Sequence, residues 1–230
     1  MADLKTAMLL AAGRGERLRP LTDHTPKPLL AVRGSPLLQH QLQWLARAGI
    51  TDVVINLRHL GERIENFCGD GARFGLHIEY SRESQTLETG GGVRQALPLL
   101  GEAPFLILNG DIFTTFNLAS LQDLPDWADI HLLLTPKPDY RERGDFNLAD
   151  GHISSRGDDY VYCGIAILRP GIFSGVSPGA FSLRDLYFQA VATGRASAQV
   201  WDGYWIDIGG PEQLQAANTD DLSGTAGGGG

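Results

Sequence analysis

The chain of 230 residues carries 19 basic and 27 acidic side chains, and its net charge of −8 opposes non-specific binding to nucleic acid or to an anionic membrane. Hydrophobic residues make up 43% and charged residues 20% of the sequence, which is typical of a globular protein and excludes a disordered or fibrous chain. No apolar run approaches the ~20 residues that a membrane-spanning helix needs, and the two cysteines suit a reducing compartment, so we expect a cytoplasmic protein.

The first half of the chain alternates short apolar runs with amphipathic segments, which is the pattern of a parallel sheet covered by helices. The apolar runs predict strands at residues 6–11, 52–57, 76–80 and 104–109. A helix is expected to begin at Ser35-Pro36, with the serine as N-cap and the proline in the first turn, and to run to Gly49. Further helices are predicted at residues 61–67 and 92–99.

The second half is more mixed. Strands are predicted at residues 129–135, 160–168 and 198–208, a hairpin at residues 145–153 with its turn at Asp150-Gly151, and helices at residues 182–193 and 211–218. These elements predict one α/β domain over residues 1–219, a three-layer α/β/α, Rossmann-like architecture around a mixed, mostly parallel sheet. Residues 220–230 are expected to form a disordered, glycine-rich tail.

A glycine-rich loop follows the first predicted strand. Gly13 and Gly15 lack side chains, so their backbone N–H groups can approach phosphate oxygens closely. The third glycine of the dinucleotide-binding fingerprint is replaced by Leu18, and the P-loop pattern GxxxxGK[ST] is absent. The loop carries Arg17 and then Lys27, which is held between two prolines that restrict the backbone. This arrangement predicts a phosphate site of a different type.

The stretch AAGRGERLRPLTDHTPKPLL resembles the signature of the sugar-1-phosphate nucleotidylyltransferases, which is roughly GxGxRxxPxTxxxPKP, and it meets every fixed position. The segments LETGGG at residues 87–92, NGD at 109–111 and WIDIG at 205–209 match further landmarks of the family in the same order, so the resemblance covers residues 6–218. It implies the nucleotidyltransferase fold and a reaction in which a nucleoside triphosphate and a sugar 1-phosphate form a nucleotide sugar and pyrophosphate.

Two carboxylates are candidate ligands of Mg²⁺, the cofactor that the resemblance implies. Asp111 follows a buried strand at its carboxyl end, where open α/β sheets bind their ligands. Asp207 lies between Ile206 and Ile208, where an unpaired carboxylate is costly. Mg²⁺ is commonly held by one or two protein carboxylates. The alternative is that Asp111 caps a turn and that Asp207 lies at a strand end without a ligand. The six histidines show neither HxH nor HExxH spacing, so zinc is not expected.

The resemblance also assigns the remaining site residues. Arg17 and Lys27 are the expected catalytic residues, and the expected nucleotide-binding residues are Ala11, Ala12, Gly13, Gly15, Glu83, Glu88 and Gly90. The sugar is expected to contact Asn109, Gly144, Asn147 and Gly164. Many relatives carry a lysine for the sugar phosphate shortly before the strand that holds Gly164. That lysine is absent here, and Arg156 is a candidate substitute.

The short length, with LETGGG followed by RGDF, resembles the family members that transfer UMP to N-acetylmuramic acid α-1-phosphate. We therefore expect UTP and this sugar 1-phosphate as the substrates, no nucleic acid or membrane partner, and a monomer or small homo-oligomer. A carboxylate at Glu83 could accept from uracil N3–H or from the two donors of a guanine edge, so a mannose- or heptose-1-phosphate guanylyltransferase is the nearest rival, and dTTP stays open. A non-catalytic nucleotide-sugar-binding protein and a metal-dependent glycosyltransferase also stay open, although the latter typically shows Asp-x-Asp.

Overall fold

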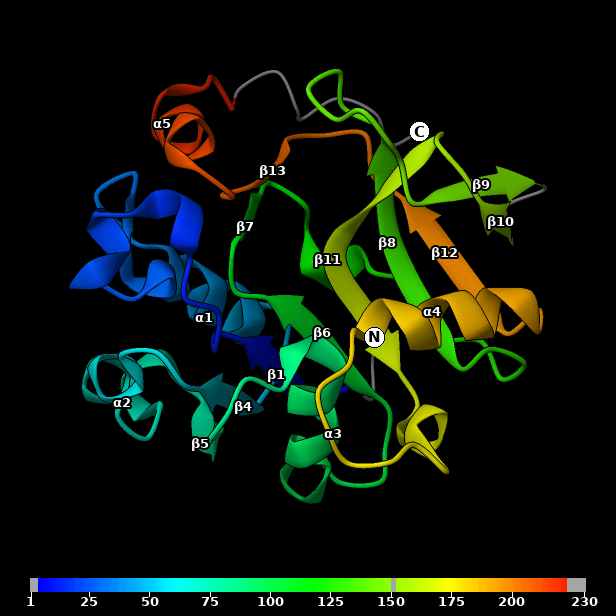
Figure 1. Cartoon of the computed structure of the whole chain (residues 1–230), viewed down its shortest axis with the longest axis horizontal. Coiled ribbons are helices and arrows are strands. Elements are labelled where there is room, and N and C mark those ends of the chain that lie inside the picture. Colours follow the sequence, from blue (N-terminus) through cyan, green and yellow to red (C-terminus); the bar gives the residue numbers. More distant parts are fainter. Residues whose placement is uncertain (1–3, 150–151, 223–230) are drawn as a thin grey trace.

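A nine-stranded mixed sheet runs through the protein in the computed structural model, which describes residues 4–149 and 152–222 (Figure 1). The predicted turn at Asp150-Gly151 and residues 223–230 of the predicted tail lie outside the described residues. The strands lie side by side in the order β5 (His77–Arg82), β4 (Asp52–Leu57), β1 (Thr6–Leu10), β6 (Phe105–Asn109), β11 (Tyr160–Leu168), β8 (Ile130–Pro136), β12 (Ala196–Val200), β10 (His152–Arg156) and β9 (Phe146–Ala149).

The pairing directions divide this sheet into two halves. Strands β5, β4, β1 and β6 are all parallel, which confirms the strand–helix alternation predicted for the first half of the chain. Strand β11 is antiparallel to both β6 and β8, and β10 is antiparallel to β9 and β12, whereas β12 is parallel to β8. The sheet is mixed, as predicted, and antiparallel pairing dominates its second half.

Helices cover both faces of the sheet, so the predicted three layers are present (Figure 1). Residues Ala7 and Leu9 of β1 belong to the core cluster that includes the buried faces of α1 (Leu37–Arg47) and α2 (Gly61–Cys68). The intervening Met8 belongs to a second cluster that includes residues of α3 (Glu88–Leu100) and α4 (Leu183–Ala192). Successive side chains of a strand point to opposite faces, which explains this division. None of the described helices is long and apolar enough to cross a membrane.

Two short ribbons lie outside the main sheet. Strand β7 (Ile112–Thr114) pairs antiparallel with β13 (Trp205–Asp207), and β2 (Ala31–Val32) pairs with β3 (Ser35–Pro36). Helix α5 (Pro211–Thr219) contacts both ribbons and contributes to a third apolar cluster. The β7–β13 ribbon brings the WIDIG segment next to the NGD segment, although almost a hundred residues separate the two in the chain.

Three predicted elements are wrong in their bounds. The strand expected at residues 198–208 is two strands, β12 and β13, because the chain turns at Asp202-Gly203, where a Cβ on Gly203 would lie 2.1 Å from the Trp201 ring. The Ser35-Pro36 pair forms strand β3, and α1 begins after it with no side-chain cap. Helix α3 begins at Glu88 rather than at residue 92, which places the glycine run inside its first turns.

Gly91→Ala is expected to destabilise the protein because α3 approaches the segment before α4 at this position. A Cβ on Gly91 would lie 2.2 Å from the carbonyl oxygen of Gly179, which is backbone and cannot rotate away. Overpacking of this kind costs ~1–3 kcal/mol, which corresponds to a fall in Tm of roughly 2–10 °C for a chain of this size. Thermal unfolding checks this result. Gly171→Ala is the matched control, since no atom lies within 4 Å of its Cβ position. Equal Tm values for the two variants would show that the backbone around Gly179 moves to make room for the added Cβ.

Candidate active site

An open pocket lies at the carboxyl ends of β1, β4 and β6, where the three parallel strands end at the same edge of the sheet. Five of the seven predicted nucleotide-binding residues line it, while Gly15 and Gly90 do not. The predicted Lys27, Asn109 and Asp111 also line it. The full lining consists of Leu10, Ala11, Ala12, Gly13, Lys27, Pro28, Asn56, Arg58, Glu83, Thr86, Glu88, Thr89, Asn109, Gly110 and Asp111.

The glycine loop makes room for the side chain of Lys27. Gly15 has a φ of 68°, in the left-handed region that favours glycine, and its carbonyl accepts a hydrogen bond of 2.9 Å from the Thr22 hydroxyl. A Cβ on Gly15 would lie 3.2 Å from the Lys27 Cβ. Arg17 belongs to the next turn, and its guanidinium lies against Gly209, where a Cβ would be 2.7 Å from Arg17 Nη2. The loop therefore brings Arg17 to the segment that follows β13.

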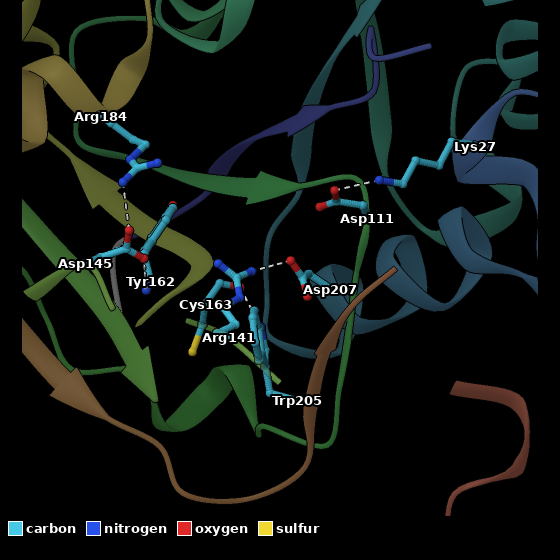
Figure 2. A network of polar contacts seen from close by, with 9 residues as sticks. All are labelled: Lys27, Asp111, Arg141, Asp145, Tyr162, Cys163, Arg184, Trp205 and Asp207. Atoms are coloured by element: carbon cyan, nitrogen blue, oxygen red, sulfur yellow. Dashed lines mark hydrogen bonds and ion pairs between the residues drawn. The ribbon is translucent and has the colours of Figure 1, made fainter. Parts of the chain in front are cut away.

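Two ion pairs lie next to one another at the site (Figure 2). Lys27 Nζ donates to Asp111 Oδ2 at 2.7 Å, and the Arg141 guanidinium donates to the Asp207 carboxylate. The Ile208 N–H donates to the Asp111 carbonyl at 2.8 Å, so the β7–β13 ribbon holds the two acidic residues together. The structure thus brings together two predicted metal ligands and one predicted catalytic residue, and it adds Arg141.

The two carboxylates influence one another electrostatically. Burial raises the pKa of Asp207, Arg141 opposes this change, and the negative charge of Asp111 adds to it. Two crowded, partly buried carboxylates form a set of oxygen donors that fits Mg²⁺, which is often bound through only one or two carboxylates. Within the part of the chain that the structure describes, no group of three or more His, Cys, Asp or Glu side chains could hold a metal ion.

Glu83 organises the backbone at the base of the pocket. The Ala11 N–H donates to Asn56 Oδ1 at 2.7 Å, and Asn56 Nδ2 donates to Glu83 Oε1 at 2.7 Å. Burial raises the pKa of Glu83, while hydrogen bonds from Asn56 and from the Leu87 backbone oppose this change. The sequence analysis missed Asn56, and its signal is a polar side chain directly after a run of apolar residues, near the end of the strand.

Of the four residues predicted to bind the sugar, Asn109 and Gly164 lie together beside Asp111. Gly164 has a φ of 78°, and a Cβ there would lie 2.9 Å from the Asn109 Cβ. The buried Gln41, which the sequence analysis also missed, donates from Nε2 to the Asn109 carbonyl at 3.0 Å. Gln41 thereby fixes the turn that leads into Asp111.

The other two predicted sugar-binding residues are tied to the segment around the β9–β10 hairpin. The Gly144 N–H donates to Asp158 Oδ1 at 2.9 Å, and Asn147 Oδ1 accepts from the Asp159 N–H at 3.3 Å. Arg156, the candidate substitute for the missing lysine, lies on the hairpin with its guanidinium 4.0 Å from the centroid of the Phe188 ring. Its charged group is thus stacked on α4.

The fold, and a pocket with a cationic lysine at the strand ends, are those of a nucleotidyltransferase. The family model described as nucleotidyl transferase matches residues 6–140, more than half of the chain, and the chain belongs to this family. The resemblance found in the glycine-rich segment is therefore confirmed, as is the prediction of a transferase enzyme.

Individual proteins are similar to this chain over most of its length. The chain is 42% identical to the N-acetylmuramate alpha-1-phosphate uridylyltransferase of Neisseria meningitidis serogroup B, over 92% of this chain and 96% of that protein. It is 30% identical to the mannose-1-phosphate guanylyltransferase of Mycobacterium tuberculosis, over 96% of this chain but only 65% of that longer protein. Among solved structures, HddC from Yersinia pseudotuberculosis has the same fold, with a TM-score of 0.77 at 24% identity over 93% of this chain and 98% of that one.

Proposed function

We propose that this protein is a sugar-1-phosphate uridylyltransferase that forms a UDP-sugar and pyrophosphate from UTP and N-acetylmuramic acid α-1-phosphate. The observation that carries the proposal is the near full-length similarity to a uridylyltransferase of that substrate, in a chain with a lysine–carboxylate pair at the strand ends. Because UTP is a cytoplasmic metabolite, we place the reaction in the cytoplasm. One domain over residues 1–219 and a monomer or small homo-oligomer stay predictions.

The chemistry needs positioning and charge neutralisation rather than a general base. A phosphate oxygen of the sugar phosphate attacks the α-phosphorus in line with the leaving pyrophosphate, and this oxygen is already anionic at neutral pH. Lys27 joins the attacking phosphate and the α-phosphate against their mutual repulsion. Arg17, whose planar guanidinium suits phosphate oxygens, stabilises the charge that collects on the departing β- and γ-phosphates.

Asp111 and Asp207 are the residues that would hold Mg²⁺. When bound there, the ion supplies positive charge to the phosphate oxygens of the nucleotide. Before it binds, the carboxylates keep Lys27 and Arg141 oriented at the site, since each accepts a hydrogen bond from one of these cations. Asn109 and Gly164, which lie beside Asp111, are the proposed sugar contacts.

Glu83 is the proposed acceptor for the base. It already accepts hydrogen bonds from Asn56 and from the Leu87 backbone, which leaves about two of the roughly four lone-pair sites of a carboxylate. These sites suit uracil N3–H and the two donors of guanine alike, so the preference for UTP rests on the similarity to a uridylyltransferase. The similarity to a mannose-1-phosphate guanylyltransferase keeps GTP with mannose 1-phosphate as the second candidate.

A pyrophosphate-release assay over four nucleoside triphosphates and a panel of sugar 1-phosphates tests the proposal. We expect kcat/KM to be highest for UTP with N-acetylmuramic acid α-1-phosphate, by ~10²-fold over GTP, because a site built for one hydrogen-bonding edge rejects another. Highest kcat/KM for GTP with mannose 1-phosphate would replace the proposal with the guanylyltransferase. Nucleotide-sugar binding without turnover of any pair would make the protein a binding protein instead.

A further inference from the structure

Besides Lys27 and Arg17, Arg141 brings to the site a further cation to which the sequence analysis assigns no role. The side chain extends from the segment between β8 and β9 to β13, where it pairs with Asp207 and lies 5.7 Å from the centroid of the Trp205 ring (Figure 2). Its backbone is held on both sides, since its N–H donates to the Pro138 carbonyl at 2.9 Å and its carbonyl accepts from Lys137 Nζ at 3.0 Å. The guanidinium is therefore presented from a fixed turn.

The two ion pairs are alike, because each joins a cationic side chain to one of the two candidate metal-binding carboxylates. Lys27 occupies an oxygen of Asp111, and Arg141 occupies an oxygen of Asp207. When both carboxylates become metal ligands, both cations gain access to other anions at the site. Two phosphate-bearing substrates must meet there under the proposed function, so a second cation can hold one of them while Lys27 joins the two phosphates.

The location of Arg141 indicates which substrate it serves. Lys27 lines the pocket together with residues from β1, β4 and α3, which are proposed for the nucleotide, and with Asn109, which is proposed for the sugar, as its place between the two phosphates requires. Arg141 lies on the other side of the Asp111–Asp207 pair, close enough to buried Cys163 to influence its thiol, and Cys163 immediately precedes Gly164. This is the part of the site proposed for the sugar. The Asp207 carboxylate and the neighbouring Tyr140 hydroxyl both hydrogen-bond the guanidinium, which has five N–H donors, so the donors that remain suit a phosphate.

We propose, on the basis of the proposed function, that Arg141 binds the phosphate of the sugar 1-phosphate and that Asp207 holds its guanidinium in position until the substrate arrives. Arg141 then takes the role for which Arg156 is the candidate from sequence. The guanidinium of Arg156 stacks on Phe188 instead.

Binding of N-acetylmuramic acid α-1-phosphate, measured by isothermal titration calorimetry in EDTA and without nucleotide, tests this role. Arg141→Met should weaken binding by ~10–100-fold, the usual effect of losing a charge-assisted hydrogen bond, and Arg141→Lys should recover part of the loss. Arg195→Met is the matched control. Arg195 pairs with Asp129 at 2.7 Å just before β8, at the end of the strands opposite the pocket, so affinity should not change. Unchanged affinity in Arg141→Met overturns the proposal.

A double-mutant cycle tests the link to Asp207. Asp207→Asn should strengthen metal-free binding because it removes a negative charge and leaves Arg141 with only a weaker, uncharged hydrogen-bond partner. The gain should be several-fold larger when Arg141 is present than in the Arg141→Met background. Equal gains in both backgrounds would show that Asp207 does not hold Arg141 for the substrate. A purely structural role of Arg141 would lower Tm without producing this coupling.

Further outcomes show which anionic group of the substrate Arg141 binds, and they distinguish a failure of this role from a failure of the proposed function. An equal loss of affinity in Arg141→Met for N-acetylmuramic acid 1-phosphate and N-acetylglucosamine 1-phosphate supports binding of Arg141 to the phosphate. A loss confined to the muramic substrate assigns Arg141 to its lactyl carboxylate and overturns the phosphate assignment. A wild-type protein that neither binds a sugar 1-phosphate nor releases pyrophosphate refutes the proposed function itself, whereas normal turnover with unaffected Arg141 variants refutes only the role of Arg141.

Discussion

Asp111→Asn is expected to lower kcat by ~10³-fold or more in saturating Mg²⁺ and to leave the fold intact. The amide has the size of the carboxylate and can still accept the hydrogen bond that Lys27 Nζ makes to Asp111 Oδ2. It removes the negative charge, however, and an uncharged ligand binds Mg²⁺ more weakly. A 10³-fold loss corresponds to ~4 kcal/mol of transition-state stabilisation.

Steady-state turnover over a range of Mg²⁺ concentrations, with thermal unfolding as the check on folding, measures this effect. The same variant should lower the pKa of Asp207, because the charge of Asp111 is one of the causes that raise it. Asp129→Asn, at the end of the strands opposite the pocket, is the control and should keep full turnover. Normal kcat for Asp111→Asn at every Mg²⁺ concentration would refute the role of Asp111 as a metal ligand.

The sequence predicts best those elements that depend only on the residues within one short segment. Strands β1, β4 and β6 are buried on both faces in their middle residues, so each contains an uninterrupted run of apolar residues. The sequence predicts one strand over residues 198–208 because apolar and aromatic content continues across the break, while the turn at Asp202-Gly203 depends on packing of the Trp201 ring. The start of α3 was placed late because its glycines have low helix propensity. Their packing against residues near α4 outweighs that preference.

The site was predictable wherever a motif lies within one short segment. The loop with Lys27 and the NGD turn were found in this way, and the structure places both at the pocket. Contacts between distant segments carry no comparable signal. Gln41 reaches the turn of Asn109 from α1, and Arg141 reaches Asp207 from a connection between strands. These partners become visible only when the β7–β13 ribbon and the helices are in place.

Lys27→Met is expected to lower kcat and kcat/KM together, by ~10²–10⁴-fold, if the lysine acts mainly on the transition state. The side chain of Lys27 is only 13% exposed, and Nζ lies 2.7 Å from Asp111, so its charge is focused where the two phosphates meet. Methionine fills the space of the stem and removes the charge. The partly exposed Asp111 keeps access to water, so we expect the loss of its partner to have little effect on folding.

Arg17→Met is the comparison that distinguishes the two cations. Arg17 is exposed, follows the glycine loop and lies against Gly209, so it is assigned to the pyrophosphate end. Its loss should raise the KM for pyrophosphate in the reverse reaction and weaken inhibition by added pyrophosphate, with a smaller effect on the affinity for the sugar phosphate. Kinetics in both directions on the two variants provide the measurement. Near-normal kcat in Lys27→Met, or an equal loss of pyrophosphate affinity in both variants, would show that the two cations do not divide the phosphates in this way.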